Sequence, residues 1–203
     1  MLQWLNNKHP EFWKNYTASF KEKTTRFVVL SIESTGLNTS KDVILGVAAI
    51  NIINNSIVVK DALEIYVSHT KSEIEFDKNE FILVSKFEKK TEGQAIEELI
   101  NFIGNAVIIG HRVHQDIELL NASLSKLNCG TLKNEALDIE IMFNKVKDTI
   151  DKKYALNEMN SFFSIPLNDR NSVADDTFSI AVLFLKLKTR KPLKTFPLYY
   201  SRE

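Results

Sequence analysis

The sequence predicts an α/β fold in which helices cover a mixed sheet. Three strand-like runs come first, at residues 26–33, 43–52 and 56–67, and strand-like and helical segments then alternate towards the C-terminus. Consecutive strands indicate an antiparallel meander, whereas the later alternation is typical of parallel strands joined by helices. With 203 residues, 44% of them apolar and 26% charged, the chain can form one soluble domain with a full hydrophobic core.

The first predicted helix covers residues 9–23. Phe12, Tyr16 and Phe20 recur at four-residue spacing, and Trp13 follows the first of them. This is the pattern of an amphipathic helix. We expect its apolar face to pack on the domain core, with docking on another protein as the alternative.

The central part of the chain is expected to contain one hairpin and then alternating elements. The second and third strands are separated by "NNS", which is a good hairpin signal. A helix at about residues 91–104, a short strand at 106–111 and a helix at about 115–128 follow. The last helix of this group ends near "NCG", where Gly130 can take a C-cap conformation.

The C-terminal part is predicted to contain two helices and a tail. The stretch "YALNEMNSFFSI" is helical and ends at Pro166, and the final helix covers about residues 173–188. The apolar positions of the final helix are Val173, Phe178, Ala181, Val182 and Leu185. The tail contains two prolines and is expected to be an extended strap on the surface.

We find no internal repeat, low-complexity segment or Gly/Ser-rich linker that would divide the chain. The expected organisation is an N-terminal amphipathic helix appendage at residues 1–25, a main domain at 26–190 and a C-terminal tail at 191–203.

Composition excludes several classes of protein. No stretch approaches the ~18 uninterrupted apolar residues that a membrane span requires, and the N-terminus lacks the pattern of a signal peptide. A single cysteine, Cys129, fits a reducing cytoplasm.

The 26 basic and 26 acidic residues balance, which argues against a protein that coats DNA, since phosphate neutralisation favours a basic excess. An enzyme that holds a few nucleotides at a strand end is compatible with this balance.

Three acids lie at the ends of predicted elements. Glu33 ends the first strand, Asp116 follows the strand at 106–111, and Asp176 is early in the final helix. In an α/β fold such positions can converge on one crevice at the sheet edge. Converging carboxylates suit hard cations such as Mg²⁺ or Mn²⁺. Alternatively, each acid is a solvated or helix-capping group.

The acids belong to three motifs: "SIESTGL" with Glu33, "IIGHRVHQDIELLN" with Asp116, and "NSVADDTFSIAVLFLKL" with Asp176. In order and spacing, these motifs resemble the DEDD exonuclease superfamily, in the DnaQ-like branch (DEDDh) that includes the epsilon proofreading subunit of bacterial DNA polymerase III. The resemblance covers about residues 26–188. Asp138 in "ALDIEIMF" matches a supporting Asp of the family.

The resemblance implies a ribonuclease H-like fold and two-metal hydrolysis of a phosphodiester at the 3′ end of a single strand. Glu33, Asp116 and Asp176 match metal-binding and catalytic acids. Substrate-binding positions of the family are matched by Thr35, Gly36, Leu37 and His111.

The chain departs from the family at its chemical positions. Ser31 stands where the family has the Asp that bridges both ions, and a neutral hydroxyl cannot replace that anion. Asn171 stands where the family has its general-base His, and an amide cannot take a proton from water near neutral pH. Arg112 and Gln115 also differ from the usual residues, and "VSKF" at 84–87 only loosely matches a His-Gly-Ile segment. Binding of Mg²⁺ or Mn²⁺ is therefore expected to be weak or lost.

Compensation by neighbouring residues is not expected. Asp175 lies beside Asp176, but adjacent helical positions differ by about 100° in direction. His111 and His114 are candidate replacement bases, although His111 matches a family position that is not the base, so we expect a hydrogen-bonded structural histidine there.

We hypothesise a DnaQ-like 3′–5′ exonuclease fold that acts on or binds nucleic-acid 3′ ends, with hydrolysis severely impaired or lost, as in a pseudoenzyme. One alternative is an active exonuclease with an altered metal site. The other is a non-enzymatic scaffold for a replication or repair protein, docking through the region of Trp4, Phe12 and Trp13.

Overall fold

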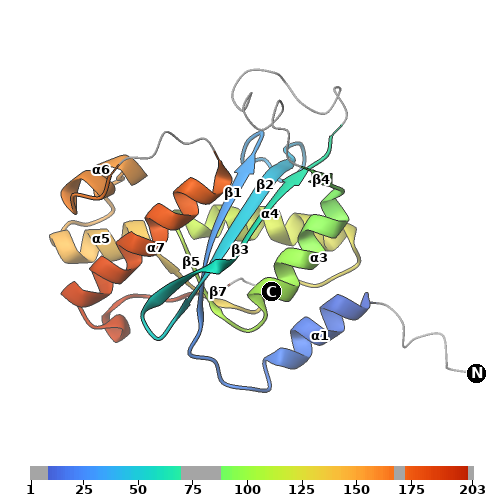
Figure 1. Ribbon diagram of the computed structural model, residues 1–203, viewed down its shortest axis with the longest axis horizontal. Helices are drawn as coiled ribbons and strands as arrows, with labels where there is room; N and C mark the ends of the chain where they lie inside the picture. The colour runs from blue at the N-terminus through green and yellow to red at the C-terminus, as the bar shows by residue number, and fades with distance from the viewer. Residues whose placement is uncertain (1–8, 70–87, 167–171, 201–203) are drawn as a thin grey trace, which may run out of the picture.

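The computed structural model describes residues 9–69, 88–166 and 172–200. A seven-stranded sheet runs through the centre of the molecule, with helices on both faces (Figure 1). The strands lie in the order β4-β3-β2-β1-β5-β6-β7. They are β1 (Phe27–Ser34), β2 (Ile44–Ile53), β3 (Ser56–Val67), β4 (Lys89–Lys90), β5 (Val107–Gly110), β6 (Glu135–Asp138) and β7 (Tyr199–Tyr200).

Strand directions confirm the predicted mixed sheet. β1 pairs with β2 and β2 with β3 in antiparallel directions, whereas β1, β5 and β6 are parallel. The β2–β3 turn is made by Asn54 and Asn55, whose φ angles of 51° and 64° are those of a tight hairpin turn. The "NNS" prediction is thus confirmed, because Asn tolerates positive φ better than most residues.

Side-chain alternation on β1 separates two hydrophobic layers. Val28 and Leu30 belong to a core that also contains residues of α1 (Glu11–Ser19), α3 (Glu92–Ile103) and α4 (Val113–Lys126). Val29 points to the opposite core. The helices of that second core are α5 (Ile139–Lys147), α6 (Leu156–Phe162) and α7 (Val173–Arg190). Successive strand residues face opposite sides, so one strand organises both layers.

The aromatic face of α1 packs on the core. Phe12 and Trp13 are only 7% and 4% exposed. They are therefore not available for docking on another protein, which corrects that alternative for these two residues. Trp4 lies outside the described residues.

One local prediction was wrong. After α4, Asn128 and not Gly130 takes the left-handed conformation, with φ 57°. On α7, Phe178 is 44% exposed, whereas Ile180 and Phe184 are buried. Phe178 precedes Ile180 by two positions, about 200° around a helix, so the two side chains face opposite ways.

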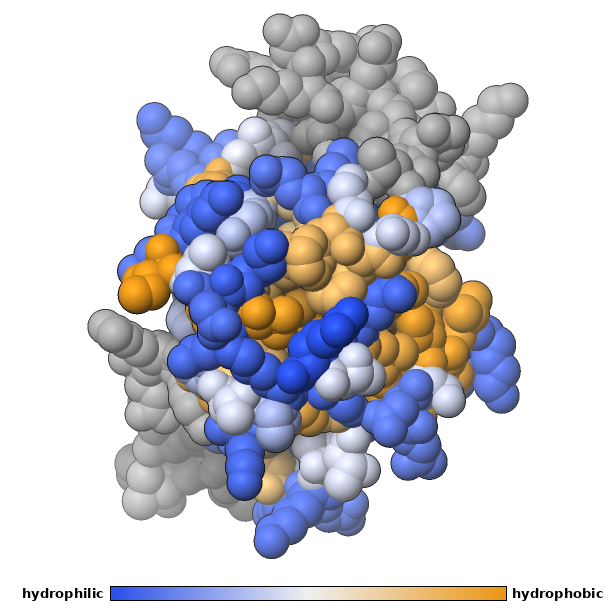
Figure 2. All heavy atoms as spheres, turned by 90° about the vertical axis from the view of Figure 1, so that its left-hand side faces the viewer, coloured by the Kyte–Doolittle hydropathy of each residue, from blue (hydrophilic) through white to orange (hydrophobic). Residues whose placement is uncertain are grey.

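Figure 2 shows apolar side chains exposed on the side formed by α5, α6 and α7.

The C-terminal tail is more than a surface strap. A short 3₁₀ turn, η2 (Leu193–Thr195), is followed by Phe196, which is 4% exposed. β7 then pairs antiparallel with β6, with Tyr199 opposite Ala136. The burial of Phe196 anchors the tail, and β7 forms one edge of the sheet.

Within the described residues, no helix is both long and apolar enough to cross a membrane.

We predict that Tyr16→Phe destabilises the protein. The Tyr16 hydroxyl donates to Asn134 Oδ1 and accepts from the backbone N–H of Lys133, both at 2.7 Å. Asn134 is 1% exposed, so its oxygen would stay buried without this donor. We expect a loss of about 1–3 kcal/mol in the free energy of unfolding, measured by urea denaturation.

Tyr154→Phe is the matched control. Its hydroxyl lies 3.4 Å from Thr149 Oγ1, so its removal should cost less. Equal losses in both variants would contradict the assigned role of the Tyr16 hydroxyl.

Candidate nucleic-acid end-binding site

The end of β1 presents Ser31 and Glu33 on one face of the sheet. They share the face of Val29, towards α7, because strand residues alternate. Ser31 is 8% exposed. The pairing of β1 with β2 shifts register between Glu33 and Ser34, and such irregularities re-aim side chains at sheet edges.

The β5–α4 corner brings in Asp116. Gly110 ends β5, and a Cβ there would lie 2.9 Å from Val113 Cγ2, so the tight corner requires glycine. Arg112 follows with φ 57°, and α4 begins at Val113. Asp116 therefore lies in the first turn of α4, next to the end of β1.

Asp138 supports this corner by capping two helices. One carboxylate oxygen accepts the backbone N–H of Val113 at 3.0 Å, and the other accepts that of Glu140 at 2.8 Å. The carboxylate is buried. Its two hydrogen bonds fix the start of α4 relative to α5, which agrees with a supporting role.

The start of α7 contributes Asp176. The neighbouring Asp175 accepts the backbone N–H of Ser172 at 3.1 Å in a capping box. Asp175 is thus occupied at the helix end, while Asp176 faces the cavity.

These elements enclose a cavity of about 200 Å³, which we name the carboxylate cavity. Of the predicted site residues, six line it: Ser31, Glu33, Leu37, His111, Asp116 and Asp176. Arg112 and Gln115, both departures from the family pattern, line it too. The structure therefore brings the three acids together at one place. Asn171 and residues 84–87 lie outside the described residues.

Thr35 and Gly36 do not line the cavity; they build the turn beside it. The Thr35 hydroxyl donates to Asp42 Oδ1 at 2.9 Å and accepts the Val43 N–H. A Cβ on Gly36 would lie 2.5 Å from Asp42 Oδ2. Asp42, which also accepts the Asn38 N–H at 2.7 Å, was missed in the sequence. Contact of Thr35 or Gly36 with a substrate stays a prediction.

The cavity disfavours the simultaneous ionisation of its neighbouring carboxyl groups. Burial raises the pKa of Asp116 well above its ordinary value, and the charges of Asp138 and Glu33 raise it further. Desolvation and repulsion both favour the protonated form of this carboxyl group in the absence of a cation.

The side chains do not form a ready divalent-ion site. Across the part of the chain that the structure describes, no group of three or more His, Cys, Asp or Glu side chains is arranged to hold a metal ion. Ser31 adds a neutral hydroxyl where the resembling family supplies an anion.

Glu140 is a buried structural neighbour of the cavity that the sequence did not indicate. Its Oε1 accepts the Tyr154 N–H at 2.8 Å and a guanidinium N–H of Arg112 at 3.1 Å. His111 donates from Nε2 to the Tyr154 carbonyl at 3.0 Å, so it is hydrogen-bonded as we expected, and its contact with a substrate stays a prediction. Burial lowers the pKa of His111. Of the two side chains at the cavity wall, His111 is thus held by the Tyr154 carbonyl and Arg112 by Glu140.

The folded protein favours the ionised form of Glu140. Burial acts to raise its pKa, but the Tyr154 N–H and the Arg112 guanidinium lower it by more, so the net pKa lies below its ordinary value. A carboxylate with a lowered folded-state pKa stabilises the protein above its unfolded-state pKa, and this contribution is lost as pH falls through the folded-state value.

We predict that Glu140→Gln lowers stability at neutral pH by about 1–3 kcal/mol, because Arg112 and the Tyr154 N–H lose an anionic acceptor. The difference from wild type should shrink as pH falls through the lowered pKa of Glu140. Urea unfolding at a series of pH values measures both effects.

Glu97→Gln, an exposed change on α3, is the matched control and should have little effect. A wild-type-like Glu140→Gln, or a difference that persists unchanged into acid, would contradict the role given to the Glu140 charge.

Comparisons with known proteins agree with this geometry. A family model described as Exonuclease (RNase_T) matches residues 28–184. DNA polymerase III subunit epsilon of Aquifex aeolicus is 24% identical over 161 residues, which cover 79% of each chain. The PolC-type DNA polymerase III of Caldanaerobacter subterraneus subsp. tengcongensis is 27% identical over 175 residues, which cover 79% of this chain and 11% of that protein.

Solved structures show the same fold. The crystal structure of E. coli exonuclease I in complex with a dT13 oligonucleotide has a TM-score of 0.69 at 12% identity, over 85% of this chain and 43% of that one. Cell-death related nuclease 4 has a TM-score of 0.63 at 13% identity, over 81% and 64%. This chain thus spans less than half of exonuclease I. Because the family model matches most of its length, the chain belongs to the exonuclease family, within the DnaQ-like 3′–5′ exonuclease superfamily.

Proposed function

We propose that this protein binds a single-stranded nucleic-acid 3′ end at the carboxylate cavity and that its two-metal hydrolysis is severely impaired or lost. The observation that carries this proposal is the lining of the cavity: Glu33, Asp116 and Asp176 line it together, and Ser31 lines it where the resembling family has the shared aspartate. Two divalent ions need shared anionic ligands to sit close together. A neutral hydroxyl cannot offset their mutual repulsion.

The third motif supports the same conclusion. Asn171 occupies the general-base position by sequence alone, since it lies outside the described residues. An amide nitrogen does not titrate near neutral pH, so it can orient water but cannot accept its proton. Loss of the base adds to the loss of the shared ligand.

The size of the cavity suits the end of a strand. At about 200 Å³ it is smaller than the ~300–1,000 Å³ of typical ligand pockets. It can hold a terminal phosphodiester group while the rest of the strand lies outside. Exonuclease I has been crystallised with dT13, so single-stranded DNA is the first ligand to test.

An active 3′–5′ exonuclease with an altered metal site is the second candidate. It is favoured by the retention of three carboxylates on one cavity, which a single Mg²⁺ or Mn²⁺ could draw together. Oxygen ligands of this kind are those that both ions prefer.

A scaffold role for a replication or repair protein is the third candidate. It is supported by relatives that are DNA polymerase III proteins and by the ExoI/SSB-Ct complex among the structural neighbours. The burial of Phe12 and Trp13 excludes these two side chains from such a docking surface, whereas the prediction for Trp4 is not tested by the described residues.

The decisive assay is release of nucleotides from a 3′-labelled single-stranded oligonucleotide with Mg²⁺ or Mn²⁺. We expect wild type and Asp116→Ala to be equally inactive, and Ser31→Asp/Asn171→His to gain activity because both missing groups are restored. The general base alone contributes typically 10²–10⁴ in rate. The matched control Ser31→Asn/Asn171→His supplies similar bulk without the charge and should stay inactive.

Wild-type release that disappears in Asp116→Ala would overturn the loss of hydrolysis and establish the altered-site enzyme. Binding is tested separately by fluorescence anisotropy of a 5′-labelled oligonucleotide at low salt, where phosphate contacts are strongest. Absence of binding there would contradict the end-binding proposal and favour a scaffold.

A further inference from the structure

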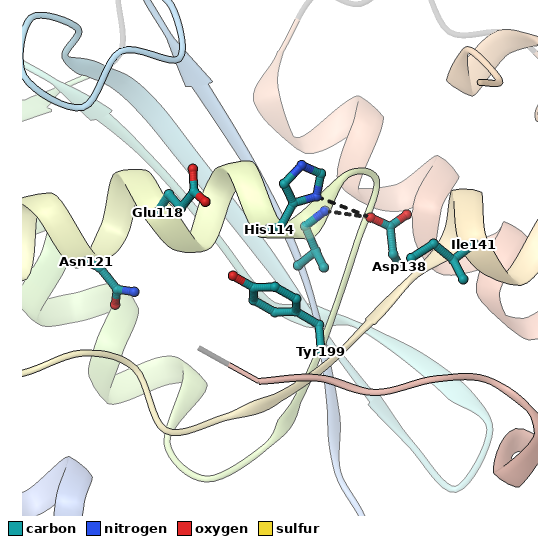
Figure 3. A pocket seen from close by; sticks show the side chains of 7 residues that line it. His114, Glu118, Asn121, Asp138, Ile141 and Tyr199 are labelled. Carbon is teal, nitrogen blue, oxygen red and sulfur yellow. Dashed lines mark hydrogen bonds and ion pairs between the residues drawn. The ribbon is translucent and has the colours of Figure 1, made fainter. Parts of the chain in front are cut away.

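A second cavity, of about 420 Å³, lies against the face of α4 opposite the carboxylate cavity (Figure 3). His114, Glu118 and Asn121 line it from α4, at spacings of four and three residues that share one helix face. Asp116 follows His114 by two positions, about 200° around the helix, and faces the other cavity. The two cavities are therefore separate sites on one helix.

The other wall of this second cavity comes from two more segments. Asp138 and Ile141 line it from the β6–α5 junction, and Tyr199 lines it from β7. The rings of His114 and Tyr199 are 6.5 Å apart between centroids and inclined at 54°. Figure 3 shows Tyr199 across from α4 with its ring beside the cavity. The pairing of β7 with β6 is what brings this ring to α4.

The charge of the cavity is negative. Glu118 and Asp138 line it, and no Lys or Arg is among the described residues that do so. Asp138 accepts two backbone N–H groups and lies 4.0 Å from His114 Nδ1. Glu118 is exposed. A phosphate-bearing ligand would meet carboxylates without a cation to bind it, whereas a cationic group would be attracted.

We propose that this cavity, the His114 cavity, binds an arginine side chain of a partner protein. A guanidinium group is planar and can stack on the ring of Tyr199 while it donates two parallel hydrogen bonds to the Glu118 carboxylate. Its methylene groups can pack on Ile141, which is 43% exposed. Lysine lacks both the planar face and the paired donors. This site does not depend on events in the carboxylate cavity.

The test is a titration of the full chain with acetyl-Gly-Arg-Gly-amide, followed by ¹H–¹⁵N NMR at low salt. Peptide on the order of 10 mM is needed, because a ligand with a few contacts binds in the millimolar range. We expect concentration-dependent shifts confined to residues 113–121, 138–141 and 199. Glu118→Gln and Tyr199→Leu should each weaken binding at least threefold, while Asp61→Asn, an exposed acid on β3, should leave it unchanged.

The same peptide with citrulline in place of arginine is the matched ligand control, since it keeps the shape and loses the charge. Equal shifts with citrulline, shifts elsewhere on the molecule, or binding that Glu118→Gln and Tyr199→Leu both leave intact would overturn the proposal. The proposal would also be overturned if a short single-stranded oligonucleotide displaced the peptide and shifted the same NMR signals. The cavity would then be a nucleic-acid site.

Discussion

The alternation of side chains along β1 is the constraint on which the rest of the structure depends. β1 lies inside the sheet, between β2 and β5. Its even-numbered apolar residues enter one core and its odd-numbered apolar residues, Phe27 and Val29, pack in the other. The same period aims Ser31 and Glu33 towards α7, beside Asp176. A slip of one residue would exchange the faces, so packing of the core and construction of the site share one register.

The shared register of β1 explains how the fold can be kept while a side chain in the cavity changes. Position 31 faces the cavity because of the alternation along β1. A serine or an aspartate at this position would therefore both point into the cavity. The fold keeps the β5–α4 corner through Gly110 and Asp138, which act by backbone geometry and helix capping. Neither contribution needs a metal ion. Under the proposed function, a serine at this position leaves these contributions to folding in place and lacks the charge that a shared ion ligand would supply.

Short sequence patterns predicted most of the helices and strands. The features that were missed depend on contacts between residues far apart in the sequence. The Asn54–Asn55 turn and the aromatic spacing of α1 are local and were predicted correctly. Glu140 gave no signal, because its partner Arg112 is 28 residues away in sequence. β7 is two residues long and depends on the burial of Phe196. Convergence of the three acids was predicted from their positions at the ends of elements. The second cavity could not be predicted in this way, because Tyr199 of the C-terminal tail forms part of its wall.

We propose that the carboxylates of this chain do not form a competent ion site because Ser31 lacks a charge. Calorimetric titration of Mn²⁺ into wild type and Ser31→Asp tests it most directly. The account predicts no saturable binding by wild type at millimolar Mn²⁺ and clear binding by the variant. Stoichiometric binding of two ions by wild type would contradict it.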